Sequence, residues 1–162
     1  MDVRVRPVRR TDSSDVVRLS LSAWEPVFAS LRKALGPRLF AKLQPDWRKS
    51  QSEAVASLCR GDGRDIVWVA EIAGVVAGFV AYVLDEESRT GKITYLAVDP
   101  AYQQRGVGTK LSHLALDRMR EAGMEIAQVE TGGDPGHAPA RRSYEKAGFT
   151  ALPIARCFQV LR

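Results

Sequence analysis

The chain has 162 residues, of which 45% are hydrophobic and 27% are charged. This composition is ordinary for a globular protein and predicts one compact domain. No apolar run approaches the roughly 20 residues that cross a membrane, and the basic N-terminus lacks the apolar stretch of a signal peptide, so we expect a cytoplasmic protein without a membrane partner. The two cysteines, Cys59 and Cys157, are far apart and have no histidines at ligand spacing. This argues against a disulfide framework and against a metal site.

The net charge of +5 would suit an anionic partner such as a nucleic acid. However, the densest basic stretch, VRVRPVRR at residues 3–10, alternates with valine at a period of two. That alternation is typical of a β-strand with one solvated face. We therefore expect no nucleic-acid partner and keep nucleic-acid binding as a lesser alternative.

The first third of the chain predicts one strand followed by helices. Residues 3–8 form the strand, and Asp12 is placed to cap a helix whose apolar residues follow at helical spacing. Pro26 is expected to end or kink that helix. Asp46 can cap a second helix, which Gly61 ends.

Three strands are predicted next. The runs DIVWVAEI and VVAGFVAYVL are joined at Ala73 and Gly74, which favours a hairpin. The run KITYLAV follows, and Pro100 closes it because proline has no backbone donor. Residues 107–122 then carry an apolar helical face, and Gly123 provides a stop.

The C-terminal part predicts IAQVE as a short strand, APARRSYEKAG as a short helix ending at Gly148, and a final strand in the tail from Phe149, which contains RCFQVL. Strands with a few helices, including one strand-helix-strand crossover, indicate an α/β (α+β) fold. We expect a mixed β-sheet in a single domain.

The stretch YQQRGVGTKL, at residues 102–111, places two glycines between a strand end and a helix start. Amides at a helix N-terminus lack intrahelical partners and carry partial positive charge, so such a turn can hold an anion such as a diphosphate. Gly106 and Gly108 would let the backbone approach the phosphate closely. The turn matches neither the dinucleotide pattern G-x-G-x-x-G nor the Walker pattern. From these residues alone, an anion site and a simple tight turn are equally favoured.

Two motifs together resemble a known family. QQRGVG, at residues 103–108, resembles the Q/R-x-x-G-x-G/A signature of the GNAT superfamily of acyl-CoA-dependent N-acetyltransferases. HAPARRSYEKAGF, at residues 137–149, resembles the second motif of that superfamily, N-x-x-A-x-x-x-Y-x-x-x-G-F. Ala140, Tyr144, Gly148 and Phe149 fall in register, and His137 stands where asparagine is usual.

The resemblance covers essentially all of residues 1–162 and implies a single N-acetyltransferase domain. It implies the acyl-CoA N-acyltransferase fold, a mixed, V-splayed β-sheet flanked by helices. The predicted element order, β-α-α-β-β-β-α-β-α-β, is similar to the order in that family. A homodimer is one assembly that the family leaves open.

The resemblance also implies where acetyl-CoA, the acyl donor, would bind. The diphosphate of coenzyme A would lie on the amides of the glycine turn, and the pantetheine arm would run beside the preceding strand. There the Val98 N–H would polarise the thioester carbonyl as an oxyanion donor. The implied coenzyme-binding residues are Leu96, Ala97, Val98, Gln103, Gln104, Arg105, Gly106, Val107, Gly108, Thr109, His137 and Tyr144.

Tyr144 holds the position that in the family protonates the departing thiolate. A tyrosine with a pKa near ~10 would donate to a thiolate with a pKa near ~8.5, which is uphill by roughly 2 kcal/mol. Stabilisation through a hydrogen bond could therefore matter as much as full proton transfer. The alternative is that Tyr144 only packs on its short helix.

A base is needed to the extent that the attacking amine is protonated. Deprotonating a lysine-like amine at pH 7 costs about 4.6 kcal/mol, whereas an α-amine costs only about 1.4 kcal/mol. Glu130, at the end of the strand before the second motif, is the first candidate for a catalytic base. Glu71 and Tyr82 are further candidates on strands, and each of the three could instead occupy a solvated face.

The function that follows from the resemblance is an N-acetyltransferase. It would move an acetyl group from acetyl-CoA to a primary amine by direct attack in a ternary complex. The acceptor would be a small-molecule amine or a protein amino group, and its pocket would lie under the helices of the first third of the chain. Aromatic residues that could form its wall, or belong to the core, are Trp24, Phe28, Phe40 and Trp47. The alternative is a non-catalytic module that senses acyl-CoA.

Overall fold

The structure is a computed structural model that describes residues 2–162. Within that range the strands form one five-stranded sheet in the order β1-β2-β3-β4-β5. Neighbouring strands from β1 to β4 pair antiparallel, whereas β5 pairs parallel with β4. The strands are β1 (Arg4–Pro7), β2 (Ile66–Ile72), β3 (Val75–Asp85), β4 (Thr90–Val98) and β5 (Ile126–Val129).

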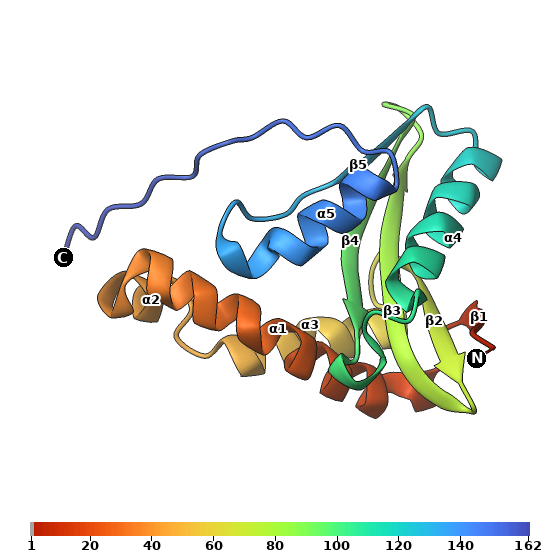
Figure 1. Cartoon of the computed structure of the whole chain (residues 1–162), viewed down its shortest axis with the longest axis horizontal. Helices are drawn as coiled ribbons and strands as arrows, with labels where there is room; N and C mark the ends of the chain where they lie inside the picture. The colour runs from red at the N-terminus through yellow and green to blue at the C-terminus, as the bar shows by residue number, and fades with distance from the viewer. Residues whose placement is uncertain (1) are drawn as a thin grey trace.

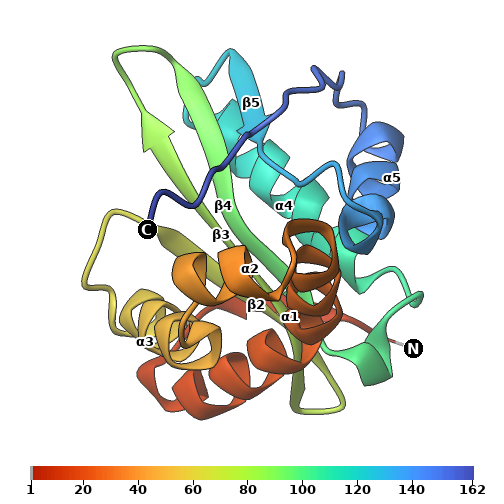
Figure 2. The same cartoon turned by 90° about the vertical axis from the view of Figure 1, so that its left-hand side faces the viewer.

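Helices cover both faces of this sheet. Figure 1 shows α4 on one side and α1, α2 and α3 on the other, and Figure 2 looks onto the second layer. Within residues 2–162 no helix is both long and apolar enough to cross a membrane. The α-helices are α1 (Ser13–Leu35), α2 (Pro37–Leu43), α3 (Trp47–Arg60), α4 (Val107–Glu121) and α5 (Ala138–Lys146), and the 3-10 helices are η1 (Arg10–Asp12), η2 (Pro100–Tyr102) and η3 (Pro135–His137).

Two hydrophobic clusters, one on each face, hold the sheet between its helices. The strand β3 contributes to both, because successive side chains of a strand point to opposite faces. Phe79 and Ala81 belong to the cluster under α1 and α3, whereas Val80 and Tyr82 belong to the cluster under α4. This explains why β3 is an almost continuous apolar run, as is typical of a strand covered on both faces.

Most of the predicted elements are confirmed. Asp46 caps α3 by accepting a hydrogen bond from the Lys49 amide, and Gly61 ends that helix with a left-handed backbone. The hairpin between β2 and β3 turns at Ala73 and Gly74, both with positive φ. The predicted mixed sheet with its strand-helix-strand crossover is therefore present.

Of the two outcomes predicted for Pro26, an end or a kink of the helix, the end is not found: α1 continues through Pro26 to Leu35. Packing on both sides of the proline, from Trp24 against Phe79 and from Phe28 against Trp47, outweighs the lost hydrogen bond.

Asp12 precedes α1 but its carboxylate does not cap that helix. It accepts hydrogen bonds from the Arg9 amide and from the Arg6 guanidinium, which also pairs with Glu71 on β2. Hydrogen bonding to Arg6 holds the pKa of Asp12 below its usual value. This buried ion network, rather than a helix cap, ties β1 to the start of α1.

The predicted final strand was also wrong. Residues after α5 form no strand, and the tail from Phe149 onward is extended and almost wholly exposed. A strand exists only where a neighbouring strand satisfies its backbone groups, and no segment of residues 2–162 pairs with this tail. Figure 1 shows the tail leaving the end of α5 and running away from the sheet.

Candidate functional site

The candidate site begins where β4 and β5 separate. Their pairing runs only from Thr90 opposite Ile126 to Ile93 opposite Val129. Beyond Ile93, β4 continues to Val98 with β3 as its only partner strand. The sheet therefore splays into a V, as the fold prediction requires, and one edge of β4 faces the gap.

The backbone direction of β4 places donors in this gap. The Asp99 amide donates to the Ala77 carbonyl on the β3 side at 2.9 Å. Because backbone groups alternate along a strand, the N–H groups of Leu96 and Val98 point to the other side, toward the gap. The Val98 carbonyl there accepts a hydrogen bond from Gln103 Nε2 at 3.1 Å.

The glycine turn lies at the same end of β4. Asp99 accepts from the Ala101 amide and starts η2, after which Gln104 and Gly106 adopt positive φ values of 59° and 80°. Gly106 is the N-cap residue of α4, so the amides of the first turn of α4 have no intrahelical partner. The start of α4 thus presents its first-turn N–H groups and the positive end of a helix dipole beside the open edge of β4.

Close packing fixes α4 against the strands at this point. A side chain on Gly78 of β3 would come within 2.8 Å of the Ala97 carbonyl oxygen and 3.2 Å of Val107 and Leu111. A Cβ on Gly108 would lie 3.5 Å from the Val98 side chain, an ordinary van der Waals contact. The first turn of α4 and the end of β4 therefore lie close together where Gly78 has no Cβ.

Tyr144 lies on α5, the helix of the second motif. Its ring packs edge to face on Phe149 with centroids 5.7 Å apart. Burial raises the pKa of Tyr144 to about 12. The phenol is therefore protonated throughout the physiological pH range and is available to donate a proton or a hydrogen bond.

His137 ends η3 and sits at the N-cap of α5. Its Nδ1 contacts the Asp134 carboxylate, which also accepts hydrogen bonds from Ser30 Oγ on α1 and from the Gly136 amide. Burial raises the pKa of Asp134, but the hydrogen bonds from Ser30 and His137 outweigh it and leave the pKa below its usual value. The His137 side chain is thereby oriented by an ordered polar network.

Sequence reasoning missed Ser30 and Asp134. The stretch TGGDPG, residues 131–136, is closely packed around them: a Cβ on Gly132 would lie 2.5 Å from the His137 ring, and a Cβ on Gly136 would lie 2.6 Å from Ser30. The Arg141 guanidinium also bonds the carbonyls of Gly132 and Asp134. Two glycines flanking an aspartate were the available signal, but the partner Ser30 is 104 residues away.

A cavity of about 150 Å³ lies between α4 and α5. Ser112 is buried beside it, and within residues 2–162 its hydroxyl finds no hydrogen-bond partner. The helix α5 has no buried residue of its own. An unsatisfied hydroxyl, a gap beside α5 and a helix N-terminus at one mouth fit a long ligand that is polar and anionic at one end, as coenzyme A is. The cavity lining is Thr109, Ser112, His113, Ser143, Lys146 and Ala147.

The candidate bases lie in different surroundings. Glu130 follows β5 and is exposed, and its pairing with Lys92 Nζ at 2.8 Å lowers the pKa of its carboxyl. Glu71 forms an ion pair with Arg6, and this pair lowers the pKa of the Glu71 carboxyl. Tyr82 is buried under α4, and burial raises the pKa of its phenol. Only Glu130 stands beside the V-shaped gap.

The four aromatic residues considered as an acceptor wall divide into two groups. Trp24 packs edge to face on Phe79 and on Tyr95 and is part of the core, and Phe40 is buried. Phe28 and Trp47 instead stack face to face at 4.2 Å and remain partly exposed between α1 and α3. Trp24 is also partly exposed, and the Arg48 guanidinium lies over the Trp47 ring at 4.5 Å from its centroid.

The chain matches the model of the acetyltransferase (GNAT) family over residues 28–149. A mycothiol acetyltransferase from Sanguibacter keddieii is 34% identical over 128 residues, which is 75% of this chain and 40% of the relative. The chain therefore spans about two fifths of the length of that curated relative.

Solved structures of the same fold are similar along nearly the whole chain. An acetyltransferase of the GNAT family from Desulfovibrio desulfuricans superposes with a TM-score of 0.71 at 24% identity, covering 94% of this chain and 87% of the other. The PaiA N-acetyltransferase from Thermoplasma acidophilum, in complex with coenzyme A, gives a TM-score of 0.72 at 13% identity over 96% and 94% of the two chains. With both motifs on the elements that form the V-shaped gap, the chain belongs to the GNAT family of acetyltransferases.

Proposed function

We propose that this protein is an N-acetyltransferase that moves the acetyl group of acetyl-CoA to a primary amine by direct attack in a ternary complex. The observation that carries the proposal is the V-shaped gap, where the open edge of β4 meets the unpaired amides of α4. The pantetheine arm of coenzyme A contains amide groups, which can pair with the open edge of β4. The diphosphate can bind the amides at the start of α4.

Donors in the gap would bind the coenzyme and stabilise the reacting carbonyl. Leu96 and Val98 face the gap with their backbone groups, so pantetheine amides could add to β4 as an extra strand does. The Val98 N–H would then bond the thioester oxygen, where negative charge develops when the amine attacks. The diphosphate would sit on residues 105–109, with Gln103 holding the turn to Val98.

Tyr144 would act on the leaving group. With a pKa of about 12 it is a weaker acid than a coenzyme A thiol near ~8.5, and complete proton transfer would cost about 5 kcal/mol. A strong hydrogen bond to the departing thiolate is therefore the better role for this phenol, with the proton of the amine completing the thiol. His137, oriented by Asp134, would contact the pantetheine arm.

Glu130 would attract the acceptor more than deprotonate it. Because its ion pair with Lys92 lowers its pKa, the carboxylate is a weak base at neutral pH. It would pair with the incoming ammonium ion, which must lose its proton to water before it attacks. An acceptor with a weakly basic amine is then favoured, because less free energy is needed to make it neutral.

A small-molecule amine is the acceptor class that we propose. The curated relatives matched by sequence include mycothiol acetyltransferases, whose name denotes a small-molecule product. The partly exposed Phe28–Trp47 stack, with the Arg48 guanidinium over the Trp47 ring, would offer adjacent apolar and polar contacts to such a molecule. An amino sugar, with polar and apolar faces, would suit that surface.

The experiment is a pair of measurements on the same protein. Calorimetric titration with acetyl-CoA should show binding, and release of free coenzyme A should be followed across a panel of amino sugars, polyamines, amino acids and peptide N-termini. Release that depends on one acceptor class supports transfer. Tight binding without release from any acceptor would support the acyl-CoA sensor instead, and absence of binding would refute both.

A further inference from the structure

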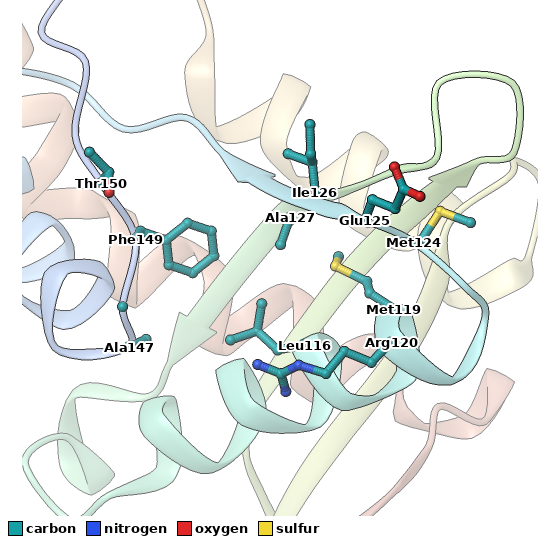
Figure 3. Close-up of a pocket in the computed structure, with 11 residues that line it drawn as sticks. Leu116, Met119, Arg120, Met124, Glu125, Ile126, Ala127, Ala147, Phe149 and Thr150 are labelled. Atoms are coloured by element: carbon teal, nitrogen blue, oxygen red, sulfur yellow. The ribbon is translucent and has the colours of Figure 1, made fainter.

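A second cavity, of about 400 Å³, lies between α4, β5 and the end of α5. Figure 3 shows two charged side chains at this cavity, Arg120 and Glu125, and its other lining residues are uncharged. Both charged groups already have partners, because Arg120 pairs with Asp117 and Glu125 pairs with Arg89. The charge that this surface offers to an ionic ligand is therefore largely neutralised.

Unpaired positive charge gathers instead in residues 30–50, which we call the basic segment. It comprises the end of α1, the helix α2 and the start of α3, and its six lysine and arginine residues against one aspartate give a net charge of +5, equal to that of the entire chain. All six cationic residues are exposed. Within residues 2–162, one of the six, Arg48, forms an ion pair, with Glu25, and the other five side chains form none. The six are Arg32, Lys33, Arg38, Lys42, Arg48 and Lys49.

The basic segment adjoins the second motif of the site. Ser30, at its start, donates a hydrogen bond to Asp134, which orients His137. Lys33 follows Ser30 by three residues on α1 and therefore shares its side of the helix. Figure 1 shows α2 and α5 on the same side of the sheet, and Figure 2 shows α2 in front of it. The positive charge thus lies on the side of the sheet where we place the acceptor.

The basic segment also flanks the Phe28–Trp47 stack. Arg32 lies one turn after Phe28 on α1, and the Arg48 guanidinium lies over the Trp47 ring. Glu25, one turn before Phe28, accepts a hydrogen bond from Arg48, but both side chains of this pair are more than half exposed. An incoming anion can exchange with such a partner, because ion pairs that are held in water are weak.

We propose that the acceptor is a primary amine that also carries an anionic group, a phosphate or a carboxylate, and that the basic segment binds this group beside the Phe28–Trp47 stack. The inference rests on the proposed function and names the class of its substrate. The ammonium group would pair with Glu130, while the anionic group would pair with Arg32 and Arg48, so the two ends of the acceptor meet opposite charges. Arginine suits either anion, because its planar guanidinium donates two parallel hydrogen bonds to a carboxylate or a phosphate.

The first test compares the binding of matched amines with and without the anionic group. Glucosamine and glucosamine 6-phosphate form one pair, and β-alanine amide and β-alanine form the other, so the two pairs distinguish phosphate from carboxylate. Calorimetric titration into the protein saturated with coenzyme A measures binding without acetyl transfer. The anionic member of at least one pair should bind about 10-fold more tightly at about 50 mM salt, and this ratio should fall at about 500 mM salt because ions screen the charges.

The outcomes of this titration separate the two proposals. No preference for the anionic member in either pair, or no binding by any member, would overturn the anion site. Preferential binding, together with no release of coenzyme A from acetyl-CoA in the amine panel, would refute the proposed transfer but support the anion site.

The second test assigns the anion site to the basic segment. Arg32→Gln and Arg48→Gln should each weaken binding of the anionic amine about 5-fold, because each removes one cation beside the stack, and should change binding of the matched amine less than about 2-fold. Arg120→Gln is the control, since it removes the same charge from α4 on the other face of the sheet. Equal weakening of both amines, or an effect of Arg120→Gln as large as the other two, would refute the site.

Discussion

The chain divides at Met119 into two regions that are stabilised in different ways. Every buried residue lies between Arg6 and Met119, and residues 120–162, all of which the structure describes, contain none. The first region is a sheet held between two hydrophobic clusters. The second consists of β5, η3, α5 and the tail, and its strand β5 forms one side of the gap that we assign to the ligand.

The second region has no buried residue of its own; it is held by partly buried apolar side chains that pack on the cluster under α4, among them Ala127, Val129 and Phe149, and by polar contacts. The Lys92–Glu130 ion pair ties it to β4, and the Asp134 network ties it to α1 through Ser30. These contacts are specific in geometry but contribute less free energy than burial does, because exposed ion pairs are worth about 0–1 kcal/mol. We infer that the first region contributes most of the free energy of unfolding, whereas the second region is positioned to contact the ligand. The predictions below are ordered by their expected effect on the free energy of unfolding.

Phe79→Ala should have the largest effect, a loss of about 3–5 kcal/mol, because Phe79 is fully buried in β3 and its removal leaves a cavity. Phe149→Ala, at the partly exposed edge of the second region, should cost less than about 1.5 kcal/mol. Urea denaturation of both variants gives the comparison. Equal losses would contradict the division of the chain at Met119.

Asp12→Asn should lower stability by about 3 kcal/mol near pH 7, because it leaves the buried Arg6 guanidinium incompletely paired. The folded-state pKa of Asp12 is depressed, so its contribution is full above the unfolded pKa of ~3.9 and is lost as the pH falls through the folded pKa. The difference between wild type and variant should therefore shrink below about pH 4. Denaturation between pH 2 and pH 7 measures it, and a pH-independent difference would refute the role given to this carboxylate.

Gly78→Ala should cost about 1–3 kcal/mol, because its Cβ would meet the Ala97 carbonyl oxygen and the first turns of α4. The same change at Gly133, in the second region, should have little effect, since no atom lies within 4 Å of that position. Thermal unfolding of both variants checks the contrast. A neutral Gly78→Ala would mean that α4 is less tightly fixed on β3 than described.

Tyr144→Phe should change stability by less than about 0.5 kcal/mol but lower kcat about 10- to 100-fold, with the affinity for acetyl-CoA unchanged. The substitution removes the hydroxyl that would donate a hydrogen bond to the leaving thiolate. Because the pKa of Tyr144 is about 12, ionisation of this phenol should not reduce the wild-type rate below about pH 11. Steady-state kinetics with the acceptor identified in the amine panel would measure this loss of kcat. An unchanged kcat would remove Tyr144 from the mechanism.

Local signals predicted the parts of the fold that depend on local chemistry. The Asp46 cap, the hairpin at Ala73 and Gly74, and the glycine turn before α4 were all readable, because each rests on the conformational preference of one or two residues. The site motifs were readable for the same reason. They place the glycine turn at the end of β4 and Tyr144 on a separate helix, as the structure does.

Contacts between distant segments decided what the sequence could not predict. The passage of α1 through Pro26 depends on packing against β3 and α3, and the role of Asp12 depends on Arg6. The tail has the alternation of a strand, yet alternation alone supplies no hydrogen-bond partner, so a strand was wrongly predicted there. The pairing of Asp134 with Ser30 had no sequence signal that connects the two positions.

The short ladder between β4 and β5 has a consequence for adaptability. Only four residue pairs join these strands, and the β5 side chains that pack on the core, Ala127 and Val129, are themselves only partly buried. A family built on this arrangement can therefore widen or narrow the gap through a few surface substitutions, without redesigning its core. New acceptors then become accessible at little cost in foldability, while the acetyl-CoA site that we propose on the α4 side of the gap stays the same.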